Sequence, residues 1–319
     1  MNNLCEIAKT VKHAKRALLI SHIMPDGDTI GSALGLAWAL RKRGIEARPS
    51  CDSPVPSTLL FLPGSADYER RHRTDEDVIF VIDCSDIDRM GSIYDAKAFA
   101  QVPVVNVDHH VTNTHFGDIE LVIPKASTAE IVVDLLEYLD IPLDKTIATC
   151  LLTGVVTDTQ GFRTSNTTAD VLRTACTLID AGASLTQVTD AAFNHRSMAT
   201  LHLWGHAFAD AQLTDGILWS EITQDLMKEA GGDSTTSSGL VNFMSSFDEV
   251  RVAVLFRELE TKQVDVSFRS SPGIDVSGIA LAFGGGGHAQ ASGCIIKGDL
   301  KDVRKRVLSA LHELVAVDS

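Results

Sequence analysis

Three short apolar runs, each followed at once by acidic or imidazole side chains, constrain this chain more than any other feature. The runs are residues 17–21, 78–82 and 102–107, and the first 182 residues alternate between such runs and helical patterns. Strand-length runs rich in apolar and β-branched residues predict strands buried on both faces, as in parallel sheets. Strands that alternate with helices indicate an α/β domain with a mostly parallel sheet.

Helical patterns occupy much of the sequence between and after these runs. Several begin near a Ser or Thr that can cap the first turn, and two are followed by a glycine, Gly44 or Gly182. We expect these helices at residues 29–43, 127–139, 145–156 and 167–181.

The pattern changes in the second part of the chain and predicts a smaller α/β domain there. Strand-like runs at residues 217–222, 250–256, 264–268 and 294–297 are interleaved with helical patterns at 224–230, 240–246 and 300–315. A length of 319 residues also favours two separate cores. We expect a first domain at residues 1–185, a linker at 186–200 and a second domain at 201–319.

Metal-ligand side chains follow the predicted strands at their carboxyl ends, where ligands bind in open parallel sheets. They are His22, Asp26 and Asp28 after the first strand, Asp83 after the second, Asp108, His109 and His110 after the third, and Asp158 after helix 145–156. Each motif alone has a simpler explanation, since Asp-Gly-Asp is common in turns and an Asp can cap a helix. Their joint occurrence favours a cluster whose mutual repulsion is offset by bound cations.

The types of side chain in this cluster indicate which cations it would bind. Imidazole and carboxylate without thiolate suit Mn²⁺, and Mg²⁺, Zn²⁺ and Co²⁺ are alternatives. Asp26 and Asp28 are two residues apart in a turn and can each face one of two ions, while Asp83 can bridge them. Two cations about 3.5 to 4 Å apart activate a water and hold a phosphoryl oxygen.

Charge and composition restrict the class of partner. The net charge of −14 argues against a long duplex on an open basic surface but permits a short or small substrate. No apolar run approaches the roughly 20 residues of a membrane span, and no signal-peptide core follows the N-terminus. Six cysteines without a CxxC pair favour a reduced protein. We therefore expect a cytoplasmic protein without a membrane partner.

These motifs resemble those of the DHH phosphoesterases. The matching segments are residues 22–28, 81–83, 108–110 and 154–159, and residues 283–293 resemble the glycine-rich signature of the DHH-associated domain. The chain is most similar to the two-domain subgroup that hydrolyses nanoRNA and 3′-phosphoadenosine 5′-phosphate (pAp), with its cyclic-dinucleotide phosphodiesterase relatives. The resemblance implies a catalytic first domain and a substrate-binding second domain, and it leaves pairing into a homodimer open.

The resemblance also implies roles for the clustered residues. It places His22, Asp26 and Asp83 on one metal and Asp28, Asp83, His109 and Asp158 on the second. His110 would face the phosphate as an acid or phosphate ligand, and Asp108 would hold a histidine. One departure is Gln160, which precedes Gly161 where the family usually reads Thr-Asp-Thr-Gly. The substrate contacts of the following loop are therefore not implied.

In the second domain, the resemblance assigns substrate binding to Arg269, Gly285, Gly286, Gly287 and His288. Glycine lets the backbone N–H groups approach an anion, and a guanidinium can bind a phosphate through two hydrogen bonds.

Together, these features predict a hydrolase that cleaves short single-stranded RNA or pAp to mononucleotides by two-metal activation of water. Asp83 and His110 are its predicted catalytic residues. A phosphodiesterase for cyclic di-AMP or its linear product pApA shares every motif and stays open. An inorganic pyrophosphatase would lack the glycine-rich signature, and an inactive nucleotide sensor would not need a complete set of ligands. The preferred substrate, cleavage polarity, metal and oligomeric state are not predicted.

Overall fold

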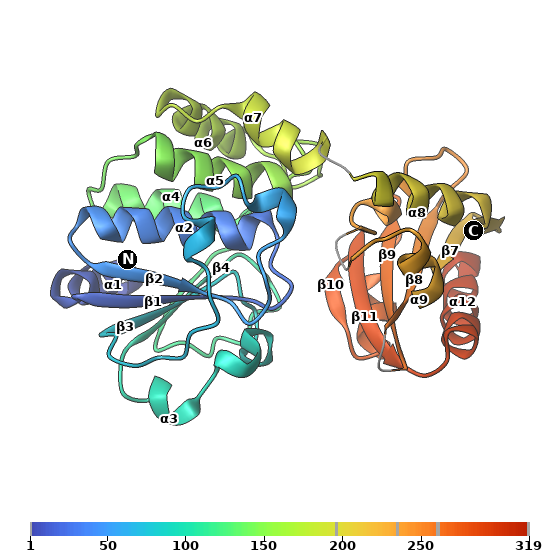
Figure 1. Ribbon diagram of the computed structural model, residues 1–319, viewed down its shortest axis with the longest axis horizontal. Coiled ribbons are helices and arrows are strands. Elements are labelled where there is room, and N and C mark those ends of the chain that lie inside the picture. The colour runs from blue at the N-terminus through green and yellow to red at the C-terminus, as the bar shows by residue number, and fades with distance from the viewer. Residues whose placement is uncertain (1, 195–196, 234–235, 260–261, 318–319) are drawn as a thin grey trace. The chain divides into compact units, whose positions relative to one another are not determined.

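The three apolar runs near the start of the chain form adjacent parallel strands in the computed structural model (Figure 1). They belong to a five-stranded, all-parallel sheet with the order β2-β1-β3-β4-β5. Its strands are β1 (Arg16–Ser21), β2 (Glu46–Ser50), β3 (Val78–Ile82), β4 (Val104–Asp108) and β5 (Ile119–Val122). The predicted fold class, a parallel α/β domain with a second α/β domain, is confirmed.

The structure describes residues 2–194, 197–233, 236–259 and 262–317. The chain divides into two units between residues 195 and 196, within the range 186–200 that we assigned to a linker. Helices occupy most of that range on either side of residues 195 and 196, which themselves lie outside the described residues.

The parallel sheet is buried on both faces, which explains why its central strands are continuous apolar runs. Alternate residues point to opposite sides: Leu19 and Phe80 pack in the core with α2, α4 and α5, whereas Leu18 and Val81 pack against η3 and α3. The helices of the first unit are α1 (Asn2–His13), α2 (Gly27–Lys42), η1 (Ser57–Leu59), η2 (Ser65–Asp67), η3 (Ile87–Ile93), α3 (Ala96–Phe99), α4 (Thr128–Tyr138), α5 (Lys145–Asp158), α6 (Ala169–Asp180), α7 (Leu185–Thr189) and the π-helical η4 (Asp190–Asn194).

Helices α2 and α5 pack unusually closely because glycines lie at their contact. A Cβ atom at Gly31 would overlap the carbonyl oxygen of Cys150 on α5. A Cβ atom at Gly154 would lie 2.6 Å from the Asp28 Oδ1 atom on α2. This close packing brings the end of α5, with Asp158, to the beginning of α2.

The second unit contains a six-stranded mixed sheet with the order β10-β11-β9-β8-β7-β6. Only the β7–β8 pair is parallel among these described strands. Helix α12 packs on one face through Val307 and Leu311, and helices α8 and α10 cover the other through Leu203 and Met244. The elements are α8 (Met198–Ala209), β6 (Gln212–Thr214), β7 (Ile217–Ile222), α9 (Gln224–Glu229), α10 (Leu240–Met244), β8 (Val252–Leu259), β9 (Gln263–Ser270), α11 (Ser277–Ala282), β10 (Gly286–His288), β11 (Ala291–Lys297) and α12 (Leu300–Val317).

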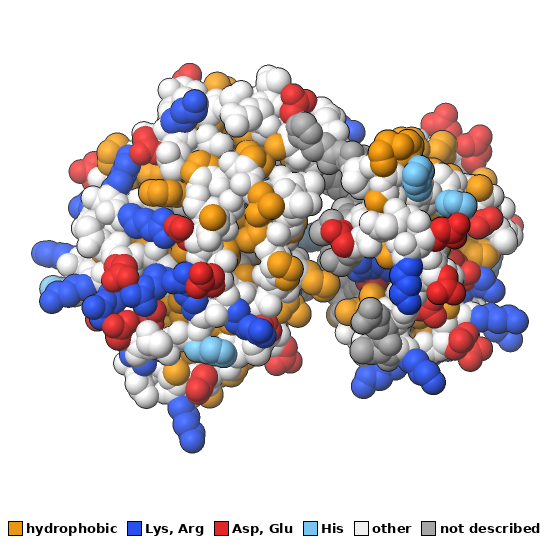
Figure 2. Space-filling view, in the orientation of Figure 1, with side chains coloured by type: hydrophobic (Ala, Val, Ile, Leu, Met, Phe, Trp, Pro, Cys, Tyr) orange, Lys and Arg blue, Asp and Glu red, His pale blue; other side chains and the backbone are white. Residues whose placement is uncertain are grey.

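The surface of the first unit carries charges of both signs close together. On the face that Figure 2 shows, Lys and Arg side chains lie beside Asp and Glu side chains rather than forming a continuous basic surface. Near the edge strand β2, for example, Glu46 forms ion pairs with both Arg16 and Arg48. Among the described helices, none is long and apolar enough to cross a membrane.

Candidate metal centre and active site

Asp83 lies at the centre of the predicted cluster because β3 is the middle strand of β1, β3 and β4. Its Oδ2 atom is 3.6 Å from His22 Nε2, and its Oδ1 atom is 3.6 Å from His109 Nε2. The backbone of Asp83 has a φ of 58°, which is uncommon for a residue with a side chain and typical of functional sites. The two carboxylate oxygens therefore face imidazoles from different strands.

Both imidazoles are oriented by backbone carbonyl groups. His22 Nδ1 is 2.7 Å from the carbonyl oxygen of Ile23, and His109 Nδ1 is 3.2 Å from that of Lys125. A carbonyl group can only accept, so each Nδ1 carries a proton, and each Nε2 faces the carboxylates. A backbone carbonyl group bonded to Nδ1, with Nε2 facing carboxylates, is the usual arrangement around metal-ligating histidines.

The turn after β1 directs its two carboxylates to different groups. Asp26 caps helix α2, where it accepts hydrogen bonds of 3.0 Å from the backbone N–H groups of Asp28 and Thr29. Asp28 is fully buried and accepts hydrogen bonds from the N–H groups of Thr128 (2.6 Å) and Ala129 (3.0 Å), at the start of α4. The α2–α5 contact also brings Asp158 Oδ2 to 3.4 Å from His109 Nε2.

All six predicted metal ligands lie together in the structure. Within each of three groups, one ligand atom per residue lies within 4.8 Å of the others; the groups are His22, Asp26 and Asp83; Asp28, His109 and Asp158; and Asp83, His109 and His110. Asp83 and His109 each belong to two groups. The donor set of carboxylate oxygens and imidazole nitrogens fits divalent cations such as Mn²⁺, and no thiolate contributes to these groups.

The crowding of carboxylates changes their proton affinity. Burial and the negative charge of Asp83 raise the pKa of Asp28 to about 8, and burial and the charge of Asp28 also raise the pKa of Asp158. For Asp83 burial acts in the same upward direction, but the hydrogen bond from His22 and the neighbouring imidazoles outweigh it and lower its pKa. Burial lowers the pKa values of His22 and His109, yet the surrounding carboxylates raise both above the ordinary value. The raised pKa values of Asp28 and Asp158 show that the carboxylates repel one another when all are charged, and a bound cation would offset this repulsion.

His110 is oriented by a buried hydrogen-bonding network. Asp108 Oδ1 accepts a 2.7 Å hydrogen bond from His110 Nδ1, and Asp108 Oδ2 accepts a 2.6 Å bond from the Asn113 side chain. Asn113 also accepts hydrogen bonds from the Asn106 side chain at 3.1 Å and from the His115 backbone at 2.7 Å. Asn113 was not predicted from the sequence. Its position three residues after the two histidines is the one signal that could have indicated a role beside them.

Two threonines were also missed. The Thr29 hydroxyl group lies 2.6 Å from both His22 Nε2 and Asp83 Oδ2, and the Thr128 hydroxyl group donates to Asp83 Oδ1 at 2.9 Å. Both are fully buried in the first turn of a helix, where a threonine is so common that its identity alone carries no signal.

The predicted substrate-binding residues of the second unit lie around one edge of its sheet. Arg269 on β9 pairs in register with Ala291 on β11, and Ala291 pairs with His288 on β10. Directly opposite residues share a face, so Arg269 and His288 lie on the same face, two strand spacings or about 10 Å apart. Arg269 Nε donates to the Asn242 Oδ1 atom at 2.6 Å, and burial lowers the pKa of this guanidinium.

The glycines beside them permit a close approach of two backbone segments. A Cβ atom at Gly285 would overlap the carbonyl oxygen of Gly293, and Gly287 has a φ of 135°. Gly286, which has open space around its Cβ position, begins β10. The glycine run therefore forms a turn at its start and the beginning of the edge strand β10 at its end.

Comparison with known proteins identifies both units. The profile of the DHH family, N-terminal domain, matches residues 16–155, and that of the DHHA1 domain matches residues 216–316. The bifunctional oligoribonuclease and PAP phosphatase NrnA of Thermus thermophilus is 36% identical over 314 residues, which cover 96% of this chain and 93% of that protein. The protein of the same name from Bacillus subtilis is 29% identical over 97% of both chains.

A solved structure has the same fold. The crystal structure of an exopolyphosphatase-related protein from Bacteroides fragilis superposes with a TM-score of 0.89 at 25% sequence identity, and covers 99% of this chain and 98% of that chain.

Proposed function

Since this chain belongs to the DHH family, we propose that it hydrolyses short oligoribonucleotides and pAp to mononucleotides in a reaction that depends on divalent cations. The observation that carries the proposal is the meeting of six metal-ligand side chains that follow β1, β3 and β4 or lie at the start of α2 and the end of α5. The choice of substrates is supported by the names of the NrnA relatives, since the sequences of these relatives match this chain along nearly its whole length.

We assign two cations to this centre, with Mn²⁺ as the expected metal. His22 and Asp26 would bind the first cation, His109, Asp28 and Asp158 the second, and Asp83 both. The two Asp83 oxygens face different imidazoles, those of His22 and His109, which supports the bridging role. When bound, the cations would lower the pKa of an attacking water and offset the negative charge of the phosphate.

The groups around His110 suit it to act on the phosphate. Asp108 accepts a hydrogen bond from His110 Nδ1, which orients the ring. A protonated His110 can donate a hydrogen bond to a phosphate oxygen, or a proton to the leaving oxygen, as charge develops there. Asn113 and Asp108 hold His110 in place without touching the substrate.

For the second unit, we assign a substrate phosphate to Arg269 and His288. Their common face and the small Ala291 between them support this role, as does the hydrogen bond that holds Arg269 Nε on Asn242. A guanidinium held in this way is already oriented for a phosphate. The net charge of −14 supports short substrates that are bound by few groups.

A panel of substrates tests the proposal. The purified protein with Mn²⁺ is offered RNAs of two to five nucleotides, pAp, pApA, cyclic di-AMP and pyrophosphate, and the products are separated by chromatography. We expect mononucleotides from the short RNAs and AMP from pAp. Preferential turnover of cyclic di-AMP or of pyrophosphate would contradict the proposed substrates. The protein would then be a cyclic-dinucleotide phosphodiesterase in the first case and a pyrophosphatase in the second.

The metal centre is tested in the same assay. Asp83→Ala removes the carboxylate between both histidines and should abolish Mn²⁺-dependent turnover. Glu137→Ala, which removes an exposed carboxylate of α4, is the matched control and should keep full activity. Full activity of Asp83→Ala in a folded protein would reject this centre as the catalytic site.

A further inference from the structure

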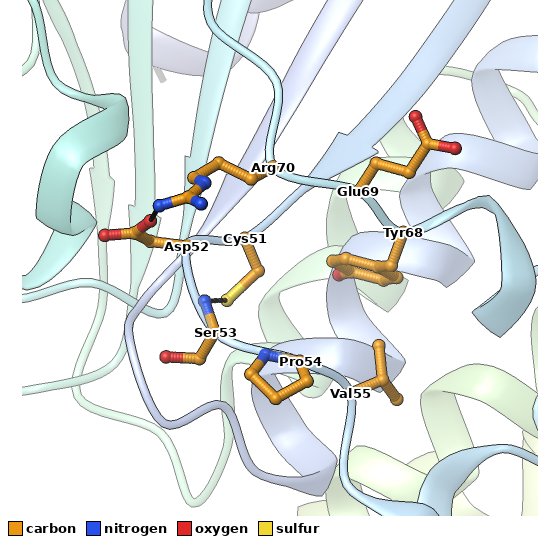
Figure 3. Close-up of a pocket in the computed structure, with 8 residues that line it drawn as sticks. All are labelled: Cys51, Asp52, Ser53, Pro54, Val55, Tyr68, Glu69 and Arg70. Carbon is orange, nitrogen blue, oxygen red and sulfur yellow. Dashed lines mark hydrogen bonds and ion pairs between the residues drawn. The ribbon is translucent and has the colours of Figure 1, made fainter.

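A cavity of about 200 Å³ lies in the first unit beside the turn that carries His22 and Asp26 (Figure 3). Its walls come from residues 51–55, which follow β2, and from residues 68–70, after η2. None of these residues belongs to the groups of metal-ligand side chains. The metal centre therefore leaves this cavity unexplained.

Three hydrogen bonds join the cavity walls to the metal-binding turn. The Tyr68 hydroxyl group is 2.9 Å from the Ser21 hydroxyl group, the Cys51 thiol donates to the His22 carbonyl oxygen at 3.2 Å, and Ser53 Oγ accepts from the Met24 N–H at 3.0 Å. Met24 is two residues from both His22 and Asp26, so its Cα atom is at most about 8 Å from theirs. The cavity wall at Ser53 is thus bonded to the middle of the turn that carries two metal ligands, so the phosphate and the base of one nucleotide can both lie beside this turn.

The walls suit a flat, largely apolar ring. In Figure 3, Pro54, Val55 and the ring of Tyr68 border the same space, and Glu69 points away from it. The hydroxyl group of Tyr68 is hydrogen-bonded to Ser21 and the residue is half-buried, so the ring is held in one orientation. Aromatic and apolar side chains of this kind stack on nucleobases.

The charges at the rim argue against a second phosphate in this cavity. Arg70, with 62% of its side chain exposed, is the single cation of the lining and is bonded to Asp52 at 3.1 Å. Asp52 and Glu69 give the lining a formal charge of −1, which repels an anion. A neutral heterocycle avoids this repulsion and gains a cation–π contact with Arg70.

We propose that this cavity binds one nucleobase of the substrate whose phosphate lies at the metal centre. The proposal rests on the proposed function and predicts that nucleotides are better substrates than simple phosphate esters. Base binding at this place holds the adjacent phosphate in position through the same turn that presents His22 and Asp26.

Abasic substrates test the proposal. The dinucleotide pApA and two analogues, each lacking one adenine, are compared with Mn²⁺ in wild-type protein and in Val55→Phe, which fills the cavity. In the wild type we expect the KM of one analogue to exceed that of pApA about tenfold. In Val55→Phe this preference should disappear. Arg70→Gln, at an exposed position, should reduce it about threefold and keeps the test decisive if Val55→Phe fails to fold.

Leu60→Phe is the matched control. It also enlarges an apolar side chain in the same part of the chain, but Leu60 is 57% exposed and outside the cavity lining, so the preference should be unchanged. Equal KM values for all three substrates in the wild type, or an unchanged preference in both cavity variants, would overturn the proposal while the phosphoesterase function stands. If the wild type hydrolyses none of them, the proposed function fails instead. In that case, the affinity for AMP measured by calorimetry tests the cavity. Equal affinities in the wild type and in both cavity variants would overturn the proposal that the cavity binds a base.

Discussion

Asp83 and Asp28 show how the same side chain serves two purposes at one site. Asp83 lies between two imidazoles and keeps its negative charge, whereas Asp28 is buried among backbone donors with Asp83 nearby and has a raised pKa. A cation can therefore bind Asp83 without displacing a proton, but must displace one from Asp28 at neutral pH. Binding of metal and loss of a proton are coupled at this residue.

Sequence reasoning found the charged residues of the centre but not the neutral ones that orient them. The position of an Asp or His immediately after a predicted strand is informative, because ligands bind at that edge of a parallel sheet. Thr29, Thr128 and Asn113 act through hydrogen bonds to residues of other elements, and these bonds depend on how the elements pack. No spacing along the chain encodes such contacts.

The role of Asn113 can be tested by Asn113→Ala. The variant removes the 2.6 Å hydrogen bond to Asp108, so His110 loses its fixed orientation. We expect kcat on pAp to fall by about 10- to 100-fold, as for other residues that orient active-site groups. The Mn²⁺ concentration for half-maximal activity should stay unchanged, because the recorded hydrogen bonds of Asn113 go to Asn106, Cys84, Asp108 and His115, none of them a predicted metal ligand.

Thr114→Ala is the neighbouring control, since it removes an exposed hydroxyl group that bonds only to the Ser85 carbonyl oxygen at 3.2 Å among its recorded partners. It should keep wild-type kcat. A parallel loss of kcat and of Mn²⁺ affinity in Asn113→Ala would mean that Asn113 acts through His109 rather than His110.

The strands that the sequence predicts in the first unit are the ones buried on both faces. The central strands β1, β3 and β4 are buried on both faces and appear as continuous apolar runs. The edge strands β2 and β5 were missed, because Glu46, Arg48 and Pro49 interrupt the first and β5 has only four residues with every second one half-buried. Edge strands commonly carry charges and proline, so their sequences resemble loops.

The contact between α2 and α5 can be tested by Gly31→Ala. The new methyl group would overlap the carbonyl oxygen of Cys150, a backbone atom that cannot move without shifting α5. We expect the free energy of unfolding to fall by about 1 to 3 kcal/mol, measured by urea denaturation, despite the better helix propensity of alanine. Activity should fall as well, because α5 carries Asp158.

Gly205→Ala provides the control for helix propensity. Gly205 lies within α8 and has nothing within 4 Å of its Cβ position, so the variant should gain about 0.5 to 1 kcal/mol. If Gly31→Ala had the same free energy of unfolding as Gly205→Ala, the α2–α5 contact would have to accommodate a methyl group for which the structure shows no space.

For the whole molecule, the net charge of −14 reflects the metal centre in part. Asp26, Asp28, Asp83, Asp108 and Asp158 contribute five acidic groups to one small volume. The raised pKa values of Asp28 and Asp158 mean that the metal-free protein carries fewer negative charges there than the sequence suggests. The acidity of the chain is therefore partly a binding capacity for cations.

This charge arrangement predicts how the stability of the whole protein depends on pH. The folded pKa of Asp28 is about 8, above its unfolded value, so the metal-free folded state loses stability as pH rises toward 8. His22 and His109 also have raised pKa values, and their contribution is complete below about pH 6.5 and is lost at higher pH. The lowered pKa of Asp83 has the opposite effect on stability, but this contribution is lost only in acid, below the pH range of these changes.

We therefore expect the melting temperature in EDTA to fall between pH 5.5 and pH 8, and the stabilisation by Mn²⁺ to be larger at pH 8 than at pH 6. At a concentration 100 times its dissociation constant, a bound cation contributes about 2.7 kcal/mol. The constant itself should decrease as pH rises, because fewer protons compete for Asp28 and the histidines. Differential scanning fluorimetry at fixed total Mn²⁺ measures both effects. Asp28→Asn removes the titrating carboxyl group and should flatten the pH dependence, and an Mn²⁺ effect independent of pH in the wild type would show that the cluster binds metal without releasing protons.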